Sequence, residues 1–424
     1  MKKNLLLLIA FTCIGWNVKA QTSWVTLNSG TTANLYCIQF LDANNGFAGG
    51  GGNGIATVIK TIDGGSTWSP INIGSNMPVR GIYFINTDSG WAVTGDPNSY
   101  TTSGTIWFTA TGGSTWNSVS WPGSPYANLS VQVNSGTVWI GATHSTSGTG
   151  QDVYYSTDNG STWTGNPANI DWIWQYGLHF NDATHGWVTG DNQTNGLINY
   201  TADGGTSWTQ RYSSTNFLYG INFANDLTGF ACGDHGTLLK TINGGSAWNP
   251  VTTNLGSDTL YGITESGAIL WLVVGTSGST LWSLNGGSSW ITGPPTPTTT
   301  NLYSVTSAPN GGGAWFWACG DGGVIIKNDI YEGIPDVNNS KTAFSIYPNP
   351  SNGIINLSSI NSQTLNLNSQ LVISDIMGRE VYHQFVNVIA QSSINVSDLN
   401  DGIYFWEVKS TNGTLDKGKL TILK

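Results

Sequence analysis

Short segments in which apolar and polar residues alternate recur along most of the chain, with glycine-rich turns between them. They are plainest in LYGINF (218–223), GFACGD (229–234), TLLKTI (237–242) and AWNPVT (247–252). A period of two is typical of half-buried strands. Four short strands joined by tight turns make one blade of a β-propeller. The pattern therefore predicts an all-β fold built from four-stranded units.

A small glycine-rich phrase that ends in tryptophan marks the repeat of this unit. It occurs six times between residues 61 and 290, at intervals of 40 to 48 residues, as TIDGGSTW, TATGGSTW, STDNGSTW, TADGGTSW, TINGGSAW and SLNGGSSW. A period in this range indicates a solenoid or a propeller. Residues 23–26 resemble a fourth strand without its unit, and residues 301–328 supply three strands without a closing phrase. We therefore expect a seven-bladed β-propeller over residues 21–330, closed by the N-terminal strand, which would remove an exposed sheet edge.

The residues of the phrase suit a hairpin between the third and fourth strands of a blade. An acid or amide at its third position can accept backbone N–H groups, its glycines permit positive φ, and its tryptophan should pack flat between blades. In the second copy Thr111 replaces the acid, which a turn would tolerate and a catalytic carboxylate would not. The predicted structural residues are Asp63, Asp158, Asp203, Asn243, Asn285, Trp68, Trp116, Trp163, Trp208, Trp248 and Trp290.

The phrase resembles the Asp-box, or BNR repeat, with the pattern Ser/Thr-x-Asp-x-Gly-x-x-Trp, and is called the box below. Residues 22–330 as a whole resemble the propeller of photosystem II assembly factors and related bacterial proteins. The resemblance implies the fold. It implies no single activity, because Asp-boxes occur in sialidases, in xyloglucan hydrolases and in proteins without catalytic function.

The C-terminal part has a different pattern. Residues 331–343 are polar and are expected to form a linker, and residues 344–424 alternate as a small antiparallel β-sandwich would. The segments YPNP (347–350), Asp375 to Arg379, and GIY (402–404) follow one another there. They resemble the type A sorting domain of the type IX secretion system of Bacteroidetes. The resemblance implies that residues 344–424 contact the type IX secretion machinery, and a carbohydrate-binding or adhesive sandwich is the alternative.

The N-terminus and the charge limit the compartment and the partners. Lys2 and Lys3 precede an apolar run that ends at Ile14, and small residues near Ala20 would permit cleavage, so residues 1–20 are expected to be a secretory signal peptide. No later segment is long and apolar enough to be a transmembrane helix. The net charge of −10 argues against nucleic acid as a partner. We expect a protein that is secreted or attached to the outer cell surface.

Few residues suit catalysis. Sialidases hold their substrate with three arginines, whereas the propeller contains only Arg80 and Arg211, so this activity is rejected. A xyloglucanase-like hydrolase needs two carboxylates that face each other across a cleft. The aspartates that end second strands, Asp96, Asp191, Asp234 and Asp321, are assigned to turns because they repeat around the ring. The acids that remain include Asp152, Asp171, Asp258 and Glu265.

No cofactor or metal is expected. His179 and His185 lack the spacing of metal ligands on a shared element. Three cysteines follow the predicted signal peptide, and this odd number argues against a disulfide framework. We expect Cys37, Cys232 and Cys319 to be free, buried thiols.

Candidate ligand-binding residues lie where the blades differ, on the face opposite the boxes. The second-to-third and inter-blade loops of blades two to four are the longer ones, and aromatic side chains suit stacking against sugars or peptides. The candidates there are Tyr100, Trp121, Tyr126, Trp172 and Trp174. A second group begins the first strands, namely Tyr36, Tyr176, Tyr219, Tyr261 and Tyr303, with Leu129 in blade three. In blade two Arg80 takes the place of the tyrosine, and it is a candidate for the same reason.

These observations favour an exported, non-catalytic binding or adhesion module for glycan or protein ligands. Two alternatives remain open, an extracellular glycoside hydrolase of the xyloglucanase-like propeller type and a scaffold or assembly factor for surface proteins.

Overall fold

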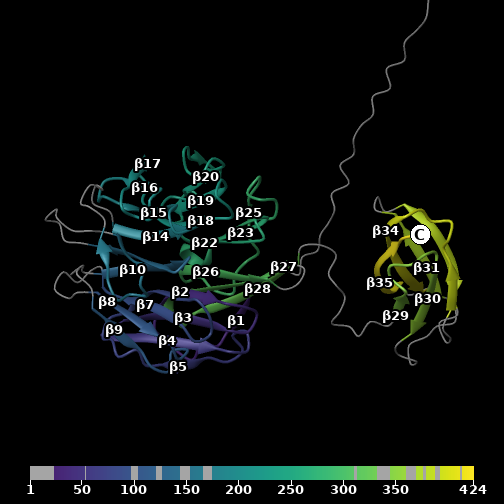
Figure 1. Cartoon of the computed structure of the whole chain (residues 1–424), viewed down its shortest axis with the longest axis horizontal. Coiled ribbons are helices and arrows are strands. Elements are labelled where there is room, and N and C mark those ends of the chain that lie inside the picture. Colours follow the sequence, from purple (N-terminus) through teal and green to yellow (C-terminus); the bar gives the residue numbers. More distant parts are fainter. Residues whose placement is uncertain are drawn as a thin grey trace, which may run out of the picture. The chain divides into compact units, whose positions relative to one another are not determined.

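The computed structural model describes residues 23–52, 54–96, 104–120, 127–143, 153–165, 174–309, 313–331, 344–359, 369–375, 379–386, 392–410 and 413–424. The chain divides into two compact units, Met1–Gly333 and Ile334–Lys424 (Figure 1). Strands form all the regular elements in these ranges except two 3-10 turns, η1 (Thr276–Gly278) and η2 (Asp321–Gly323). The predicted all-β fold is confirmed.

The described part of the first unit contains seven four-stranded antiparallel sheets, numbered here in chain order. Sheet 1 contains β2 (Leu35–Phe40), β3 (Gly46–Gly52), β4 (Ile55–Thr61) and β5 (Ser69–Ile71). Sheet 2 contains β6 (Val79–Phe84), β7 (Gly90–Thr94), β8 (Thr105–Thr109) and β9 (Asn117–Val119). Sheet 3 contains β10 (Ala127–Asn134), β11 (Thr137–Thr143), β12 (Val153–Ser156) and β13 (Thr164–Gly165). Sheet 4 contains β14 (Trp174–Phe180), β15 (Gly186–Asp191), β16 (Gly196–Thr201) and β17 (Thr209–Ser214).

Sheets 5 and 6 are likewise built from four consecutive strands, whereas sheet 7 combines three consecutive strands with β1 from the N-terminal end. Sheet 5 contains β18 (Leu218–Phe223), β19 (Gly229–Gly233), β20 (Leu238–Thr241) and β21 (Asn249–Pro250). Sheet 6 contains β22 (Leu260–Ser266), β23 (Leu270–Gly275), β24 (Thr280–Ser283) and β25 (Ile291–Thr292). Sheet 7 contains β26 (Leu302–Pro309), β27 (Gly313–Gly320), β28 (Ile325–Tyr331) and β1 (Val25–Leu27). In sheet 7 the strand nearest the N-terminus pairs antiparallel with β28.

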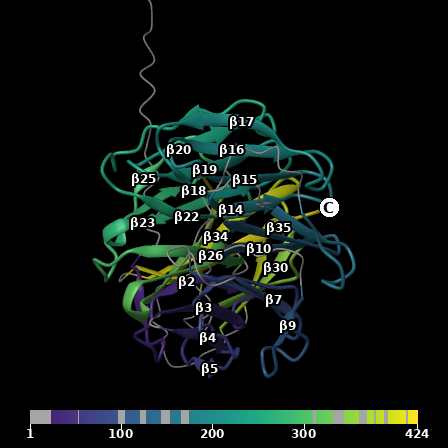
Figure 2. The ribbon, with the colours of Figure 1, turned by 90° about the vertical axis from the view of Figure 1, so that its left-hand side faces the viewer.

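The first strand of each sheet contacts the first strand of the next. The contacting pairs are β2 with β6, β6 with β10, β10 with β14, β14 with β18, β18 with β22, β22 with β26, and β26 with β2. Figure 2 shows β2, β10, β14, β18, β22 and β26 towards the middle of the unit, with β5, β17 and β25 at its rim. Neighbouring sheets therefore cover one another, and β7, β19 and β23 are buried along their whole length.

Stacked aromatic rings join several neighbouring sheets. A phenylalanine of a first strand lies flat against an aromatic ring of the preceding sheet, with ring centroids 3.5 to 3.9 Å apart. The pairs are Phe40 with Trp317, Phe84 with Phe47, Phe180 with Trp139, and Phe223 with Trp187. Buried aromatic pairs of this kind stabilise a fold by about 0.5–1.5 kcal/mol beyond the area that they bury.

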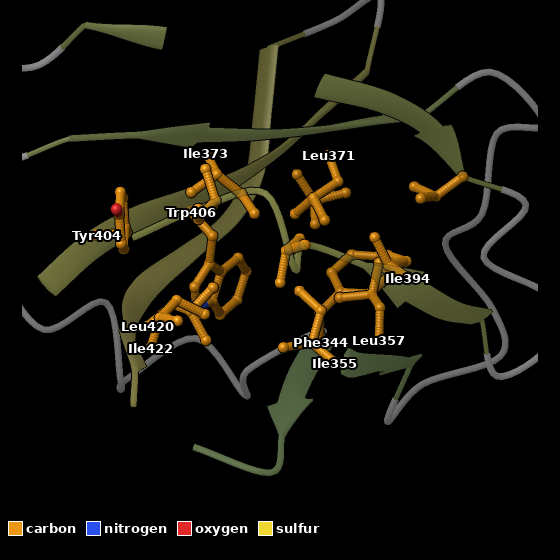
Figure 3. Packing of buried hydrophobic residues seen from close by; sticks show 14 residues of the cluster. Phe344, Ile355, Leu357, Leu371, Ile373, Ile394, Tyr404, Trp406, Leu420 and Ile422 are labelled. Carbon is orange, nitrogen blue, oxygen red and sulfur yellow. The ribbon is translucent and has the colours of Figure 1, made fainter. Parts of the chain in front are cut away.

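The second unit consists of two antiparallel sheets over one core. One sheet contains β29 (Phe344–Tyr347), β30 (Ile354–Ser359) and β33 (Ser392–Asn395). The other contains β32 (Glu380–Val386), β31 (Ser369–Ser374), β34 (Gly402–Ser410) and β35 (Gly413–Ile422). Figure 3 shows the indole of Trp406 among aliphatic side chains from both sheets.

The predicted motif residues hold turns of this unit. The side-chain oxygen of Asn349 accepts the N–H of Thr421 at 2.9 Å and so ties the YPNP segment to β35. The guanidinium of Arg379 donates to the carboxylate of Asp375 at 2.7 and 2.8 Å. The hydroxyl of Tyr404 donates to the carbonyl of Asn400 at 2.9 Å.

Candidate functional site

Strand register places the boxes and the starts of the first strands at opposite edges of each sheet. In sheet 1, Thr61 at the start of the box pairs with Gly46, whereas Leu35 at the start of β2 pairs with Gly50. The edge that carries the boxes is called the box face below. The opposite edge, where the first strands begin, is called the bulge face for the reason given below.

Hydrogen bonds close each box on itself. In the first box, the N–H of Gly65 donates to the hydroxyl of Thr61 at 2.9 Å, and this hydroxyl donates to the carboxylate of Asp63 at 2.8 Å. The same carboxylate accepts the N–H and the hydroxyl of Thr67 at 2.9 and 2.6 Å. Asn243 and Asn285 accept the corresponding N–H at 2.9 Å, so an amide serves as well as an acid.

The second box, which lacks the acid, and the lowered pKa values of the box aspartates also indicate a structural role. In the second box the hydroxyl of Thr111 accepts the N–H of Thr115 at 2.9 Å, the bond that Asp63 makes in the first. The hydrogen bond from the hydroxyl of Thr67, with others from its N–H and from Thr61, lowers the pKa of Asp63 to about 2. Asp158 has the same arrangement, and its pKa is also lowered to about 2. The box carboxylates are therefore engaged acceptors within a turn.

The closing tryptophans each lie nearly perpendicular to one neighbouring aromatic ring, and their flat packing between blades stays a prediction. Each forms an edge-to-face pair with an interplanar angle between 71° and 90°. The pairs are Trp68 with Phe40, Trp116 with Phe84, Trp163 with Trp91, Trp208 with Phe180, Trp248 with Phe223, and Trp290 with Phe230. The positive ring edge and the negative ring face attract each other in this geometry.

The glycine carbonyls of a box also receive donors from the preceding sheet. The indole N–H of Trp317 donates to the carbonyl of Gly64 at 3.1 Å, and Trp139 and Trp187 repeat this bond towards Gly204 and Gly244. The ammonium group of Lys60 donates to Gly112 and that of Lys240 to Gly287, at 3.1 and 3.0 Å. The box is thus both a turn and a clasp between sheets.

The bulge face has its own repeat. All seven first strands shift register against their partner at the second or third residue, which is a β-bulge. Bulges leave one residue unpaired and redirect its side chain, and they are frequent beside functional sites. The unpaired residues are Tyr36, Arg80, Leu129, Tyr176, Tyr219, Tyr261 and Tyr303, called the bulge cluster from here on.

Glycine after the bulge allows neighbouring bulges to approach closely. A Cβ on Gly177 would lie 2.5 Å from the carbonyl oxygen of Tyr219, and one on Gly220 would lie 2.9 Å from that of Tyr261. Contacts this short would force the backbone apart. Glycine therefore permits the close approach of the bulges in the Tyr176–Tyr219 and Tyr219–Tyr261 pairs.

The tyrosines of the bulge cluster form one continuous wall. Their ring centroids lie 4.9 Å apart for Tyr176–Tyr219, 5.4 Å for Tyr219–Tyr261, 5.2 Å for Tyr261–Tyr303 and 5.4 Å for Tyr303–Tyr36. The guanidinium of Arg80 continues it, 3.9 Å from the centroid of the Tyr36 ring. The predicted group of tyrosines and Arg80 is thus brought together at one place.

Three carboxylates are hydrogen-bonded to the hydroxyl groups of this wall. The hydroxyl of Tyr303 donates to Asp321 at 2.8 Å, that of Tyr219 donates to Asp234 at 3.5 Å, and Tyr176 is hydrogen-bonded to Asp191. The sequence assigned these aspartates to turns. Asp191 does accept the N–H of Gln193 at 2.7 Å, but turn formation is only part of its role. The strand register explains why these aspartates meet the tyrosines. The end of the second strand, where each aspartate lies, is opposite the start of the first strand, where each tyrosine lies.

Burial and charge change the titration of these groups. Burial raises the pKa of the Tyr176 hydroxyl, and the nearby charge of Asp191 raises it further. Burial also raises the pKa of Asp191, with a contribution from the like charge of Asp234. A buried carboxylate beside like charges is an electrostatic feature typical of functional sites.

Other predicted residues are dispersed or lie outside the described ranges. Trp174 is partly exposed and pairs with Asp191 in the sheet register, beside the bulge of Tyr176. Arg211 lies on the outer strand β17 with its guanidinium 5.0 Å from the Tyr200 ring, away from Arg80 on β6. The residues outside the described ranges, whose roles remain predictions, are Tyr100, Trp121, Tyr126, Trp172, Asp152 and Asp171.

The two described acids proposed for hydrolysis lie at opposite ends of one strand. Asp258 precedes β22 on the bulge face and accepts the hydroxyl of Ser279 at 2.6 Å. Glu265 lies near the other end of β22 and accepts the N–H of Ala268 at 2.9 Å. Seven residues of extended chain span about 20 Å, whereas glycosidase carboxylates lie within about 10 Å of each other. These two acids therefore do not form a glycosidase pair.

The other features of the described region are the cysteines, the histidines and one cleft. Cys37, Cys232 and Cys319 are free and buried, as expected. No group of three or more His, Cys, Asp or Glu residues suited to a metal occurs in the described ranges. A cleft of about 430 Å³ between β17 and β20 is lined by residues that include Tyr212, His235 and Thr253. None of the described helical turns is long or apolar enough to cross a bilayer.

Two parts of the chain match known protein families. Residues 345–422 match the secretion system C-terminal sorting domain. Residues 168–251 match the photosynthesis system II assembly factor YCF48. Both predicted resemblances are confirmed, and the sorting domain implies export to the cell surface or the extracellular space. No curated protein matches the chain by sequence.

Solved structures share the propeller fold at low sequence identity. YCF48 bound to D1 peptide is 19% identical, with a TM-score of 0.56 over 72% of this chain and 94% of YCF48. PorZ of Porphyromonas gingivalis, a surface component of the type IX secretion system, is 12% identical, with a TM-score of 0.56 over 92% of this chain and 59% of PorZ. The GH74 xyloglucanase of Xanthomonas campestris is 10% identical, with a TM-score of 0.56 over 80% of this chain and 59% of the enzyme. At these identities the likeness shows the fold alone.

Proposed function

We propose that the chain is an exported, non-catalytic β-propeller that binds a protein ligand through the bulge cluster. In this proposal the seven sheets are the blades of one ring, closed by β1, and the tyrosine wall surrounds the mouth of its central channel. The observation that carries the proposal is the bulge in every sheet, which directs five tyrosines and one arginine to one place. Aromatic side chains and arginine are the residues that dominate binding energies at protein interfaces.

Export is the second part of the proposal. We propose that residues 1–20 are removed as a signal peptide, that residues 21–330 are the binding module, that residues 331–343 are a linker, and that residues 344–424 engage the type IX secretion machinery. PorZ supports a surface location by its fold, and YCF48, solved with a peptide bound, supports a peptide ligand for this propeller shape. The aromatic candidates Tyr100, Trp121, Tyr126, Trp172 and Trp174 would extend the binding surface of blades two to four.

Selection from a random peptide library tests the proposal with the full mature chain. We expect the wild-type chain to enrich peptides that bind it. The double variant Tyr219→Ala/Tyr261→Ala should no longer bind the enriched peptides. The matched control is Ile62→Ala, because Ile62 lies in the first box and is 70% exposed. Urea unfolding of each variant separates loss of binding from loss of fold.

Three outcomes would overturn the proposal. They are the absence of any enriched peptide, enrichment that the double variant retains, and enrichment that Ile62→Ala abolishes. A glycan array and an assay for reducing-end release, run on the same chain, cover the alternatives. Glycan retention that depends on Tyr219 and Tyr261 would replace the protein ligand by a glycan, and sugar release would replace the binding module by a hydrolase.

A further inference from the structure

The hydrogen bonds of the bulge cluster fix what its hydroxyl groups can still do. A tyrosine hydroxyl donates one hydrogen bond and accepts others. The hydroxyls of Tyr303, Tyr219 and Tyr176 direct their protons to the carboxylates of Asp321, Asp234 and Asp191. The hydroxyl oxygen of Tyr303 also accepts from the side chain of Asn301, whereas those of Tyr219 and Tyr176 receive no side-chain donor among the described residues. A ligand therefore meets acceptors along this wall, and it must bring the donors.

The ring faces of the cluster attract positive charge. An ammonium or guanidinium group over a tyrosine ring within about 6 Å is attracted by the ring quadrupole. Arg80 already shows this arrangement within the cluster, because its guanidinium lies 3.9 Å from the centroid of the Tyr36 ring. Tyr176, Tyr219, Tyr261 and Tyr303 carry no such intramolecular cation among the described residues.

Acidic residues outnumber basic ones around the wall. Asp191, Asp234 and Asp321 are hydrogen-bonded to the tyrosines of sheets 4, 5 and 7, and Asp258 lies just before β22 in sheet 6. Arg80 is the basic residue of the cluster, and it is held by Tyr36 and by the carbonyl of Gly95 at 3.3 Å. The arc from Tyr176 to Tyr303 therefore presents a negative potential, which steers and holds cations.

From this arrangement we propose that the arc of Tyr176, Tyr219, Tyr261 and Tyr303 binds the charged side chain of a lysine or arginine of a partner protein. The alkyl stem lies against the rings, the N–H donors meet the tyrosine hydroxyl oxygens, and the aspartates neutralise the charge. This inference rests on the proposed protein-binding function and specifies the group that is recognised.

Short peptides that differ at one central residue test this inference. The probes are blocked nonapeptides with lysine, arginine, acetyl-lysine, norleucine or glutamate at the centre of an otherwise neutral sequence, titrated against the full mature chain. We expect the lysine and arginine peptides to bind at least tenfold more tightly than the acetyl-lysine and norleucine peptides. Acetyl-lysine keeps the stem and removes the charge, so that this difference isolates the cation. The advantage should shrink as salt is raised.

Two variants report on the parts of the site. Asp321→Asn removes one charge but keeps an acceptor for the Tyr303 hydroxyl, so affinity for the lysine peptide should fall several-fold while the unfolding midpoint hardly changes. Tyr219→Leu removes a ring face and its hydroxyl and should reduce the affinity further. Ile62→Ala on the box face should leave the affinity unchanged.

The outcomes separate this inference from the proposed function. Equal binding of lysine and acetyl-lysine peptides, lost in Tyr219→Leu, would overturn the cationic ligand and leave a protein-binding module. No binding of any peptide at the bulge cluster would overturn both. Free putrescine is the remaining probe, and if putrescine binds while the lysine and arginine peptides do not, the source of the cation is a small amine and the inference is wrong.

Discussion

The box face and the bulge face carry equally regular repeats, yet they differ in what their polar groups do. On the box face, the third residue of each of the six boxes, whether Asp, Asn or Thr, accepts the same backbone N–H, and glycine carbonyls receive lysine or tryptophan donors from the neighbouring sheet. On the bulge face, tyrosine protons are directed to carboxylates, and the partly exposed rings follow one another along the wall. Repetition alone therefore does not separate structure from function, whereas the exposure and the partners of the repeated side chains do.

The largest expected effect on stability comes from removing a side chain that joins two sheets at the box face. Trp317 is fully buried, stacks on Phe40 with ring centroids 3.7 Å apart and donates to Gly64. Trp317→Ala should lower the free energy of unfolding by about 3–5 kcal/mol, measured by urea denaturation. A change below 1 kcal/mol would show that sheets 7 and 1 do not depend on this contact.

A smaller loss is expected inside a single box. The hydroxyl of Thr61 is buried and accepts the N–H of Gly65, so Thr61→Val leaves this donor without a partner. The free energy of unfolding should fall by about 1–3 kcal/mol. Thr61→Ser is the control, because Ser156 and Ser283 make the same bond in their boxes. Equal effects of the two substitutions would argue against the hydroxyl as the cause.

The bulge face should tolerate the removal of one hydroxyl. Tyr303→Phe keeps the ring contacts with Tyr36 and Tyr261 and removes the bond to Asp321. Asp321 is only partly buried, so water can replace the lost donor and the loss should be about 0.5–1.5 kcal/mol, as for an ordinary hydrogen bond. Urea unfolding should therefore show a loss in this range, smaller than that of Thr61→Val. A loss of several kcal/mol would make the bulge cluster primarily structural and would weaken the contrast between the faces.

The smallest effect at neutral pH is expected for Asp63→Asn, since Asn243 and Asn285 serve in other boxes. The stability change at pH 7 should stay within about 0.5 kcal/mol, as for other exposed substitutions. The pKa of Asp63 is about 2 in the folded chain against an ordinary value of 3.8. The carboxylate therefore stabilises the fold above about pH 4, and this contribution is lost as the pH falls towards 2. Thermal unfolding between pH 2 and 5 should accordingly show a shallower acid loss for the variant than for the wild type.

Much of the architecture could be predicted from the sequence because the same strand and turn pattern occurs in several copies. The alternation of residues 218–252 matches β18, β19, β20 and β21 within a few residues, and the strand near Trp24 pairs with β28 as its position in the repeat suggests. The sorting domain was recognisable from three motifs in order. Local rules suffice where every copy of a unit repeats the same turn chemistry.

The site was only partly predictable. The tyrosine group and Arg80 could be found from their shared repeat position. Their mutual contacts depend on seven β-bulges, which the residue pattern did not predict. Asp191, Asp234 and Asp321 were assigned to turns, because the pairing that sets them opposite the tyrosines joins residues some 15 to 18 positions apart. The edge-to-face geometry of Trp68 and the other closing tryptophans likewise depends on tertiary packing.

One paired binding measurement tests the central claim, that the bulge face is the functional one. Isothermal titration of the lysine nonapeptide would compare the wild-type chain, the bulge-face variant Tyr219→Ala/Tyr261→Ala and the box-face variant Asp63→Asn/Asp203→Asn, all confirmed as folded. The account predicts that the bulge-face variant loses at least tenfold in affinity, while the box-face variant binds like the wild type. Unchanged affinity in the bulge-face variant, or loss of affinity in the box-face variant, would contradict it.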